Sequence, residues 1–159
     1  MRLNRNGLLY RQSTSAVILN KNEQMLIVQK NSFKNNEWDI PGGGIEDGEK
    51  PELAIIRELS EELGNSKFEV IKVSRLKDSY EWPDEYINQR IKNNKPIFRG
   101  QERIQFLVRF TGEEGEIKIQ EEEIRVAKWV FLNELSSFLI FPNQMEKMKN
   151  LLKEFSLAN

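Results

Sequence analysis

The sequence contains no cysteine and no histidine. The absence of cysteine excludes a disulfide framework and a thiol nucleophile. The absence of histidine excludes an imidazole base, an imidazole metal ligand and the catalytic triads that depend on one. Any acid–base chemistry must therefore come from carboxylates, lysine, tyrosine or water bound to a metal ion.

Long apolar runs and a strong net charge are also missing. No run approaches the roughly 18 apolar residues of a membrane span, and the first residues, MRLNRNGLLYRQ, lack the apolar core of a signal peptide. The net charge of −1 gives no global field that would recruit nucleic acid. We expect a cytoplasmic protein that binds neither membranes nor double-stranded DNA. Its 159 residues, 38% of them hydrophobic, predict a single domain over residues 1–159.

One stretch carries more carboxylate than a helix of its length needs. After three glycines at residues 42–44, Pro51 and Gly64 mark the start and end of a predicted helix of about four turns. Its core side is expected to hold Leu53, Ile56, Leu59 and Leu63. The opposite side is expected to hold Glu58, Glu61 and Glu62. Like charges at this spacing, and acids in a last helical turn, are destabilising. A hard divalent cation would explain them, and a solvated acidic face is the alternative.

The glycines and glutamates match a known motif. The pattern G-x5-E-x7-R-E-U-x-E-E-x-G-U, in which U is bulky and apolar, maps onto Gly43, Glu49, Arg57, Glu58, Leu59, Glu61, Glu62 and Gly64. Only the last position departs, where Asn65 stands in place of an apolar residue. The stretch therefore resembles the Nudix box. The resemblance implies the Nudix fold, an α/β/α sandwich with a mixed β-sheet.

The resemblance also implies a chemistry, namely hydrolysis of a nucleoside diphosphate linked to another group with the help of Mg²⁺ or Mn²⁺. It places metal ligands at Glu58, Glu61 and Glu62, with Glu62 bridging ions. The carbonyl of Gly43 is an expected additional ligand. Arg57 is expected to orient the carboxylates, and an ordinary ion pair with Glu61 is the alternative.

Two further groups of residues follow from the same resemblance. Glu49 either assists the site or forms a structural salt bridge, and Gly44 and Gly64 are structural. Outside the box, several segments are similar to bacterial RNA pyrophosphohydrolases and the related dinucleoside polyphosphate hydrolases. They are Tyr10-Arg11, Tyr80-Glu81-Trp82-Pro83, Arg99-Gly100-Gln101, Glu123 ahead of Lys128-Trp129-Val130, and Phe141. Three positions, Gly42, Gln105 and Pro142, depart from that subfamily's pattern.

In that subfamily the residue matching Glu123 lies near the metals as ligand or general base. The alternative is that Glu123 belongs to a solvated acidic run at residues 121–123. Substrate contacts are expected at Arg11 for phosphate, at Phe141 for the base, and at Tyr80.

Basic residues gather in one later stretch. Residues 86–101 contain four cations and no acid: Arg90, Lys92, Lys95 and Arg99. We expect residues 81–99 to form a long loop, and loops of this length in compact domains are usually functional or disordered. Its cations, with Arg11, are expected to receive the substrate's phosphates. The alternative is that they only keep the loop soluble.

The remaining pattern predicts a strand-rich chain. Strands are expected at residues 14–19, 25–29, 37–40, 68–80, 104–110 and 127–132, the first two as a hairpin. Asn133 is expected to cap a short helical turn, and residues 142–155 to form a last helix. The apolar stripe of that helix is Met145, Met148, Leu151, Leu152 and Phe155.

Three functions are compatible with these features. The favoured one is a metal-dependent pyrophosphohydrolase that acts on a dinucleoside polyphosphate or a triphosphorylated RNA 5′ end. The second is a pyrophosphatase that removes unwanted nucleoside triphosphates. The third is a Nudix-like module that binds nucleotides without catalysis, but such modules commonly lose glutamates of the box and none is lost here.

Overall fold

The computed structural model describes residues 7–157. The segment considered for a signal peptide begins outside this range. The elements in chain order are β1 (Tyr10–Leu19), β2 (Gln24–Lys30), α1 (Pro51–Leu63), β3 (Phe68–Glu81), α2 (Asp84–Lys92), β4 (Gly100–Phe110), the 3₁₀ turn η1 (Glu114–Glu116), β5 (Ile124–Phe131), the 3₁₀ turn η2 (Leu132–Ser137) and α3 (Gln144–Glu154). Among the described residues, no helix is long and apolar enough to cross a membrane.

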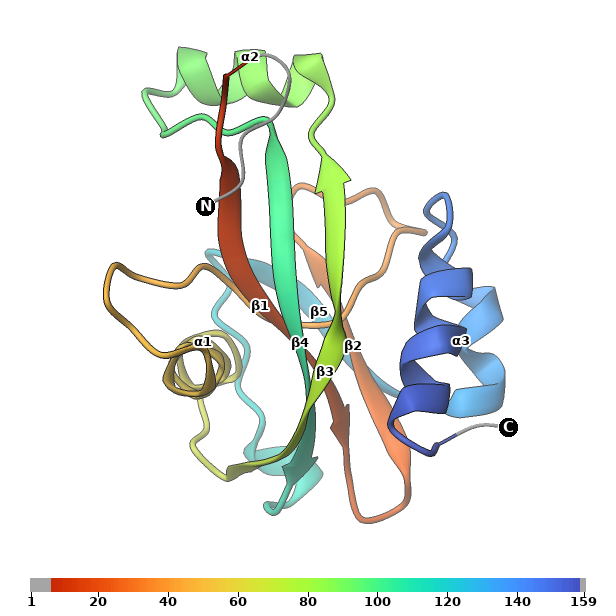
Figure 1. The fold of residues 1–159 in the computed structure, drawn as a ribbon. Helices are drawn as coiled ribbons and strands as arrows, with labels where there is room; N and C mark the ends of the chain where they lie inside the picture. Colours follow the sequence, from red (N-terminus) through yellow and green to blue (C-terminus); the bar gives the residue numbers. More distant parts are fainter. Residues whose placement is uncertain (1–6, 158–159) are drawn as a thin grey trace.

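Five strands form one mixed sheet in the order β3-β4-β1-β2-β5. The central pair, β1 and β4, is parallel, and the other neighbouring strands are antiparallel. Helix α1 covers one face of the sheet and α3 covers the other, while α2 lies across one end (Figure 1). The α/β/α sandwich implied by the family resemblance is therefore confirmed.

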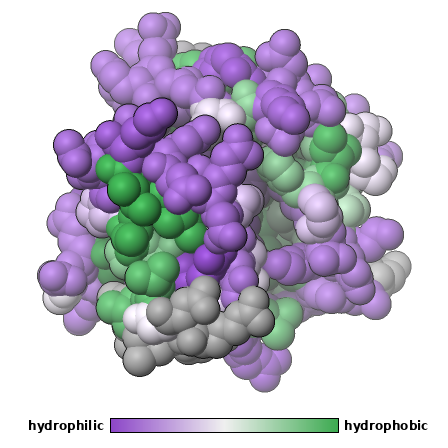
Figure 2. Space-filling view, turned by 90° about the horizontal axis from the view of Figure 1, so that it is seen from above, coloured by the Kyte–Doolittle hydropathy of each residue, from purple (hydrophilic) through white to green (hydrophobic). Residues whose placement is uncertain are grey.

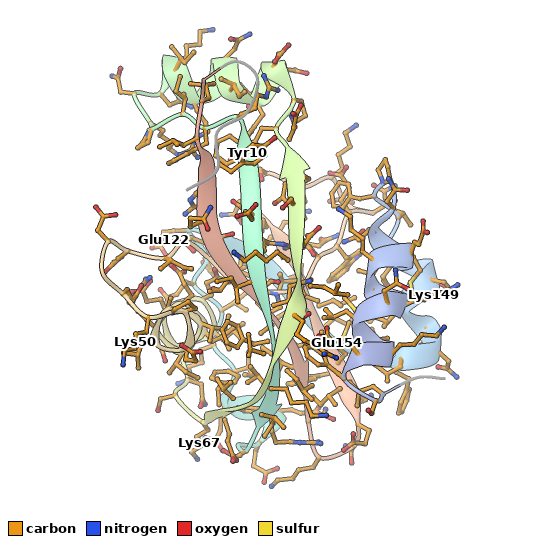
Figure 3. All side chains as sticks on the ribbon, viewed as in Figure 1. Tyr10, Lys50, Lys67, Glu122, Lys149 and Glu154 are labelled. Carbon is orange, nitrogen blue, oxygen red and sulfur yellow. The ribbon has the colours of Figure 1, made fainter. Side chains whose placement is uncertain are left out.

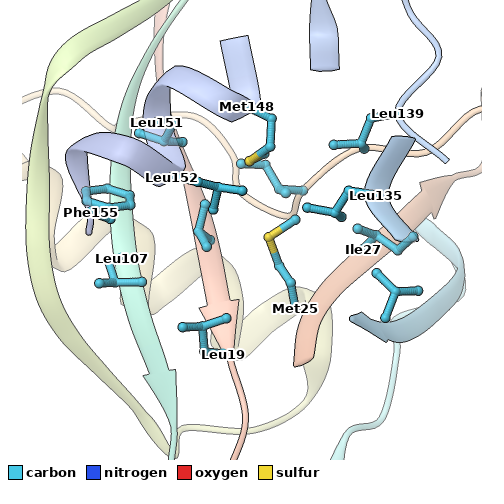
Figure 4. Packing of buried hydrophobic residues seen from close by; sticks show 13 residues of the cluster. Leu19, Met25, Ile27, Leu107, Leu135, Leu139, Met148, Leu151, Leu152 and Phe155 are labelled. Atoms are coloured by element: carbon cyan, nitrogen blue, oxygen red, sulfur yellow. The ribbon is translucent and has the colours of Figure 1, made fainter. Parts of the chain in front are cut away.

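Alternating side chains on β1 build a separate core on each face of the sheet. Ala16 and Ile18 pack towards α1, whereas Val17 and Leu19 pack towards α3, as the period of two in a strand requires. The predicted apolar stripe of α3 is confirmed, and its buried members close the second core (Figure 4): Met148, Leu151, Leu152 and Phe155.

The chain between β2 and α1 runs through a gap in the sheet. The strands β1 and β2 share a single register pair, Leu19 with Met25, and diverge beyond it. Residues 39–45, referred to here as the glycine loop, fill the space. Asp39 forms an isolated bridge with Val28 of β2. Hydrogen bonds then join the loop to β1, from the N–H of Ala16 to Pro41 (2.9 Å), of Thr14 to Gly43 (2.8 Å) and of Ile45 to Gln12 (3.0 Å).

The prediction of a strand at residues 37–40 was wrong, because the chain pairs with β2 only at Asp39 before crossing towards β1. The prediction of a loop at residues 81–99 was also wrong, because it contains α2. Acids occupy the first turn of α2 and Arg90 and Lys92 the last, which is the order that the helix dipole favours. Only Ile87 of this helix is buried, so the sequence shows no apolar stripe.

Smaller differences concern the ends of elements. Strand β5 begins three residues before the predicted start, at Ile124. The turn η2 is capped at Phe131 instead of Asn133. Helix α3 begins at Gln144, after Asn143 adopts a left-handed conformation with φ of 65°. The predicted end of α1 at Gly64 is confirmed, since Gly64 has φ of 61° and stands against the carbonyl of Lys118, where a side chain has no room.

Candidate active site

The buried and exposed faces of helix α1 differ from those predicted. Leu53, assigned to the core, is 62% exposed, whereas Glu62, assigned to the opposite side, is only 3% exposed. The apolar residues that the helix does bury are Ala54, Ile55, Leu59 and Leu63. At about 100° per residue, Glu58 and Glu62 fall between Ala54 and Leu59 around the helix. These two glutamates therefore point towards the sheet, at the edge of the core.

Three carboxylates converge beside this helix. One oxygen from each of Glu58, Glu62 and Glu123 lies within 4.8 Å of the other two. These three residues are referred to below as the carboxylate cluster. Glu58 and Glu62 are one helical turn apart on α1, and Glu123 is the exposed member, from the loop before β5. The structure thus brings Glu123 to the box glutamates, as the family resemblance implied.

The loop that carries Glu123 is anchored on the end of α1. The N–H of Lys118 donates to the carbonyl of Leu63 at 2.8 Å, and that of Gln120 donates to the carbonyl of Glu62 at 2.9 Å. These bonds satisfy carbonyls that a helix end leaves without partners. From the side of β2, the N–H of Asn31 donates to the carbonyl of Glu123 at 3.0 Å. Glu123 is therefore held from two elements.

The cluster is electrostatically costly without a cation. Burial raises the pKa of Glu62 to about 8, and repulsion from Glu58 and Glu123 adds to this, while Lys30 and a backbone hydrogen bond from Gly42 act in the opposite direction. The Oε2 atom of Glu62 is buried and has no hydrogen-bond partner among the described residues. A buried polar atom left unsatisfied costs about 1–3 kcal/mol. Converging carboxylate oxygens with an unused acceptor fit a hard divalent cation.

Glu61 lies outside this cluster. Its side chain is 60% exposed, and it borders a shallow hollow together with Ser60, Gln120, Glu122 and Glu123. Figure 3 labels Glu122, whose loop passes between α1 and the α2 end of the sheet. The structure therefore places Glu61 beside the cluster, where its charge faces the same opening.

Arg57 joins the helix, the glycine loop and the cluster. Its guanidinium donates to both oxygens of Glu49, at 2.8 and 2.9 Å, to Glu58 at 3.0 Å and to the carbonyl of Gly44 at 2.9 Å. The distance to Glu61 is longer, 3.5 Å, so the ordinary ion pair with Glu61 is the weakest of these contacts. Hydrogen bonds from Arg57 lower the pKa of Glu49 to about 2. Burial raises the pKa of Glu58, and Arg57 opposes that rise.

Two glycines of the loop lie close to charged side chains. A β-carbon at Gly43 would lie 2.3 Å from the carboxyl of Glu58, and one at Gly44 would lie 2.5 Å from the guanidinium of Arg11. The carbonyl of Gly43 accepts hydrogen bonds from the N–H and the hydroxyl of Thr14, at 2.8 and 3.0 Å. Gly43 therefore lies against the cluster, but its carbonyl would have to release the Thr14 hydroxyl to bind a metal ion.

Residues 9–155 match the family model described as NUDIX domain. The chain belongs to the Nudix family. The RNA pyrophosphohydrolase of Rickettsia prowazekii (strain Madrid E) is 35% identical to it over 148 residues, which cover 92% of this chain and 89% of the relative. The RNA pyrophosphohydrolase of Rickettsia bellii (strain OSU 85-389) is 35% identical over 151 residues, covering 94% and 91%.

Solved Nudix-type structures share the fold at low sequence identity. The E. coli dihydroneopterin triphosphate pyrophosphohydrolase superposes with a TM-score of 0.68 at 17% identity, covering 89% of this chain and 96% of the other. A C. elegans Ap4A hydrolase binary complex superposes with a TM-score of 0.62 at 18% identity, covering 91% and 95%. The chain is therefore a Nudix hydrolase, an enzyme that acts on phosphoanhydrides, and Nudix hydrolases generally use divalent metal ions.

The residues expected to contact substrate do not all lie at the Nudix carboxylates. Arg11, Gln101 and Tyr80 are aligned across β1, β4 and β3. Arg11 donates to Gln101 at 3.3 Å, and Gln101 donates to the hydroxyl of Tyr80 at 2.9 Å. Burial raises the pKa of Tyr80 to about 12, so its hydroxyl stays protonated. Arg11 reaches the edge of the site over Gly44.

Two of the four cations expected to bind phosphate already make ion-pair, hydrogen-bond or ring contacts with other residues of the protein. Arg99 pairs with Asp84 at 2.8 Å and also donates to the carbonyl of Trp82. The guanidinium of Arg90 lies 4.9 Å from the centre of the Trp82 ring and donates to the carbonyl of Pro96 at 2.8 Å. These arginines hold α2 and the segment after it, and their binding of substrate phosphates stays a prediction.

The two lysines of this segment remain exposed. Neither Lys92 nor Lys95 has an ion-pair partner among residues 7–157. Seen from the α2 end, the surface is mostly hydrophilic, with hydrophobic side chains exposed in smaller patches (Figure 2). Phe141 lies before α3, with its ring edge-on to Phe33 at a centroid distance of 5.4 Å. Its contact with the substrate base stays a prediction.

Sequence reasoning missed two residues next to the site. Thr14 ties the glycine loop to β1 with both its N–H and its hydroxyl. Lys30, at the end of β2, lowers the pKa of Glu62 by its charge. A lone cation at the end of an otherwise uncharged strand is the signal that could have pointed to Lys30. Nothing in the sequence distinguishes Thr14 from its neighbours.

Proposed function

We propose that this Nudix hydrolase cleaves a phosphoanhydride in the 5′-polyphosphate of an RNA, with dinucleoside polyphosphates as substrates of the same chemistry. The carboxylate cluster, with the unsatisfied oxygen of Glu62, is the observation that carries the reaction. The substrate class is supported by relatives named RNA pyrophosphohydrolase that align with 92% of the chain.

Glu58 and Glu62 would hold Mg²⁺ or Mn²⁺ with Glu123 beside them, and Glu61 would add charge at the opening. When bound, the metal ion would neutralise negative charge on the phosphate oxygens and would lower the pKa of a bound water molecule. Arg57 would hold Glu58 in place through its contacts with Glu49 and Gly44.

Glu123 is assigned the role of general base. It is the exposed member of the cluster, so water can reach its carboxylate, whereas Glu62 is buried. In the reaction, water forms a bond to phosphorus, the bridging P–O bond breaks, and Glu123 takes the proton. The leaving phosphate group, which is pyrophosphate when a triphosphorylated RNA becomes a 5′-monophosphate, departs with the electron pair of the broken bond. General-base assistance of this kind typically contributes 10²–10⁴-fold.

A substrate panel tests the proposal. Triphosphorylated RNA, diadenosine tetraphosphate, ADP-ribose and free nucleoside triphosphates are compared with Mg²⁺ and with Mn²⁺, and each is repeated in EDTA. We expect metal-dependent conversion of RNA to its 5′-monophosphate with the highest kcat/KM, followed by the dinucleotide. A higher kcat/KM for free nucleoside triphosphates would indicate a sanitising pyrophosphatase instead. Binding without hydrolysis of any substrate would contradict the proposed reaction.

A further inference from the structure

Four charged side chains form a network on the face of the sheet that α3 covers, in which Arg103 and Asp78 are buried and Lys147 is exposed. Arg103 of β4 is 8% exposed. Its guanidinium donates to Asp39 at 2.9 Å and to a single oxygen of Asp78 on β3 at 2.8 and 3.1 Å. Lys147 of α3 donates to the other oxygen of Asp78 at 2.8 Å. Two acids and two bases therefore balance one another, and burial opposes charge on Asp78 while Arg103 and Lys147 keep its pKa below the usual range.

Asp39 connects this network to the glycine loop, because it is the first residue of that loop. Its backbone is paired with Val28 in both directions, at 2.8 and 3.0 Å. Its Oδ1 atom accepts from the N–H of Ile40 at 2.8 Å and from Gln144 at 3.4 Å. Its Oδ2 atom is the one that meets Arg103. The loop entry is thus fixed from β2, from α3 and from β4.

The far end of the glycine loop lies directly against the cluster. Four residues after Asp39, Gly43 stands so close to Glu58 that a single β-carbon would overlap the carboxyl group. The next carbonyl, that of Gly44, accepts from Arg57 at 2.9 Å. Packed protein transmits displacements because it contains few voids. A shift at Asp39 must therefore be met by a shift of Glu58 or by loss of the bonds between the loop and β1.

We propose that Arg103 is a positioning residue of the active site, acting through Asp39 and the glycine loop on Glu58. The inference rests on the proposed function, since it concerns carboxylates assigned there to the metal. Arg103 itself lies across the sheet from the cluster, on the face of Leu107. Residues that support metal ligands without touching the metal typically change affinity or activity 10–100-fold when they are mutated.

Conservative variants test the role. Arg103→Lys keeps the charge, but an ammonium group lacks the planar fork that serves two carboxylates at once. Asp39→Asn keeps an oxygen for Ile40 and Gln144 and turns an amide N–H towards Arg103. The matched control is Arg109→Lys on the same strand, where the arginine pairs with Glu23 at 2.7 Å near the hairpin. Binding of Mn²⁺ without substrate is measured from the electron paramagnetic resonance signal of the free ion.

We expect Arg103→Lys and Asp39→Asn to bind Mn²⁺ about 10–100-fold more weakly, and the control to stay within about twofold of wild type. Amide exchange at Thr14 and Ile45, whose N–H groups join the loop to β1, should accelerate in both variants. At moderate Mn²⁺ concentrations kcat should fall, and excess Mn²⁺ should restore it, while KM for substrate stays within about twofold. Recovery by metal separates positioning from a general loss of stability.

Three results would count against these conclusions, and they can be told apart. If both variants bind Mn²⁺ as wild type does, the positioning role is refuted. If KM rises while Mn²⁺ affinity is unchanged, Arg103 contacts substrate and the role is again refuted. If Glu62→Gln leaves Mn²⁺ affinity unchanged, the proposed metal site itself fails, and this inference fails with it.

Discussion

Replacing Glu62 with glutamine should stabilise the metal-free enzyme while abolishing its activity. In the unfolded chain this carboxyl ionises near 4.5, but in the folded protein its pKa is about 8, mainly because of burial. Between these values the folded state binds more protons than the unfolded state, so wild-type stability falls as pH rises from about 4.5 to about 8 and levels off above that. The shift corresponds to at most about 5 kcal/mol, part of which comes from repulsion by the charges of Glu58 and Glu123.

Glutamine has almost the same shape, carries no charge and can donate its amide to a neighbouring carboxylate. We expect metal-free Glu62→Gln to be at least about 1 kcal/mol more stable than wild type at pH 8.5, which raises Tm by about 2–4 °C for a chain of this size. At pH 4.5 and below the difference should vanish. Mn²⁺ at 100 times its Kd should add about 2.7 kcal/mol to wild type and much less to the variant.

Thermal unfolding in EDTA from pH 4 to pH 9, repeated with Mn²⁺ and paired with steady-state rates, measures these effects. Glu52→Gln is the control, because Glu52 is an exposed acid in the first turn of the same helix, where its charge is favourable. It should lower stability slightly at neutral pH and leave turnover unchanged. If the stability of wild type and of Glu62→Gln changed with pH in the same way, or if that variant turned over substrate at a near-normal rate, the reasoning about the cluster would be refuted.

Three further predictions concern single steps of the mechanism. Glu123→Ala should lower kcat by about 10²–10⁴-fold, whereas Glu121→Ala should change it by less than about threefold; small and equal effects would place Glu123 in a solvated acidic run. Arg57→Lys should lower kcat/KM about 10–100-fold, and an unchanged rate would reduce Arg57 to a surface ion pair. Replacing Lys92 and Lys95 together with glutamine should raise KM for RNA and flatten its salt dependence, but not KM for a dinucleotide; an unaffected KM for RNA would exclude these lysines from binding.

The fold and the box could be predicted because their signals are local. Pro51 and Gly64 marked the ends of α1, and alternating apolar residues marked most strands. The orientation of α1 could not be predicted, because Glu62 lies towards the sheet, where sequence patterns place apolar side chains. Helix α2 escaped notice because it buries only Ile87.

The candidate site was less predictable than the fold, since its members meet only through tertiary packing. Only the family resemblance predicted that Glu123 lies near the box. In the structure its position follows from the hydrogen bonds between its loop and the end of α1. Arginines were the least predictable residues. The sequence suggested Arg90 and Arg99 as phosphate ligands. In the structure the guanidinium of Arg90 stacks on Trp82, and that of Arg99 pairs with Asp84. A sequence shows that a residue is charged, but it does not show whether a guanidinium group is already bonded to other residues of the protein.

The parallel pairing of β1 with β4 has a consequence for synthesis of the chain. These strands lie at the centre of the sheet and join residues about 90 positions apart, whereas β1 and its hairpin partner β2 share one register pair. Until β4 leaves the ribosome, the edge of β1 that pairs with it in the folded protein has no partner strand. Contacts so distant in sequence form slowly and leave strand edges open to other chains. Nascent or truncated chains that end before residue 100 are therefore the forms of this protein most prone to aggregate.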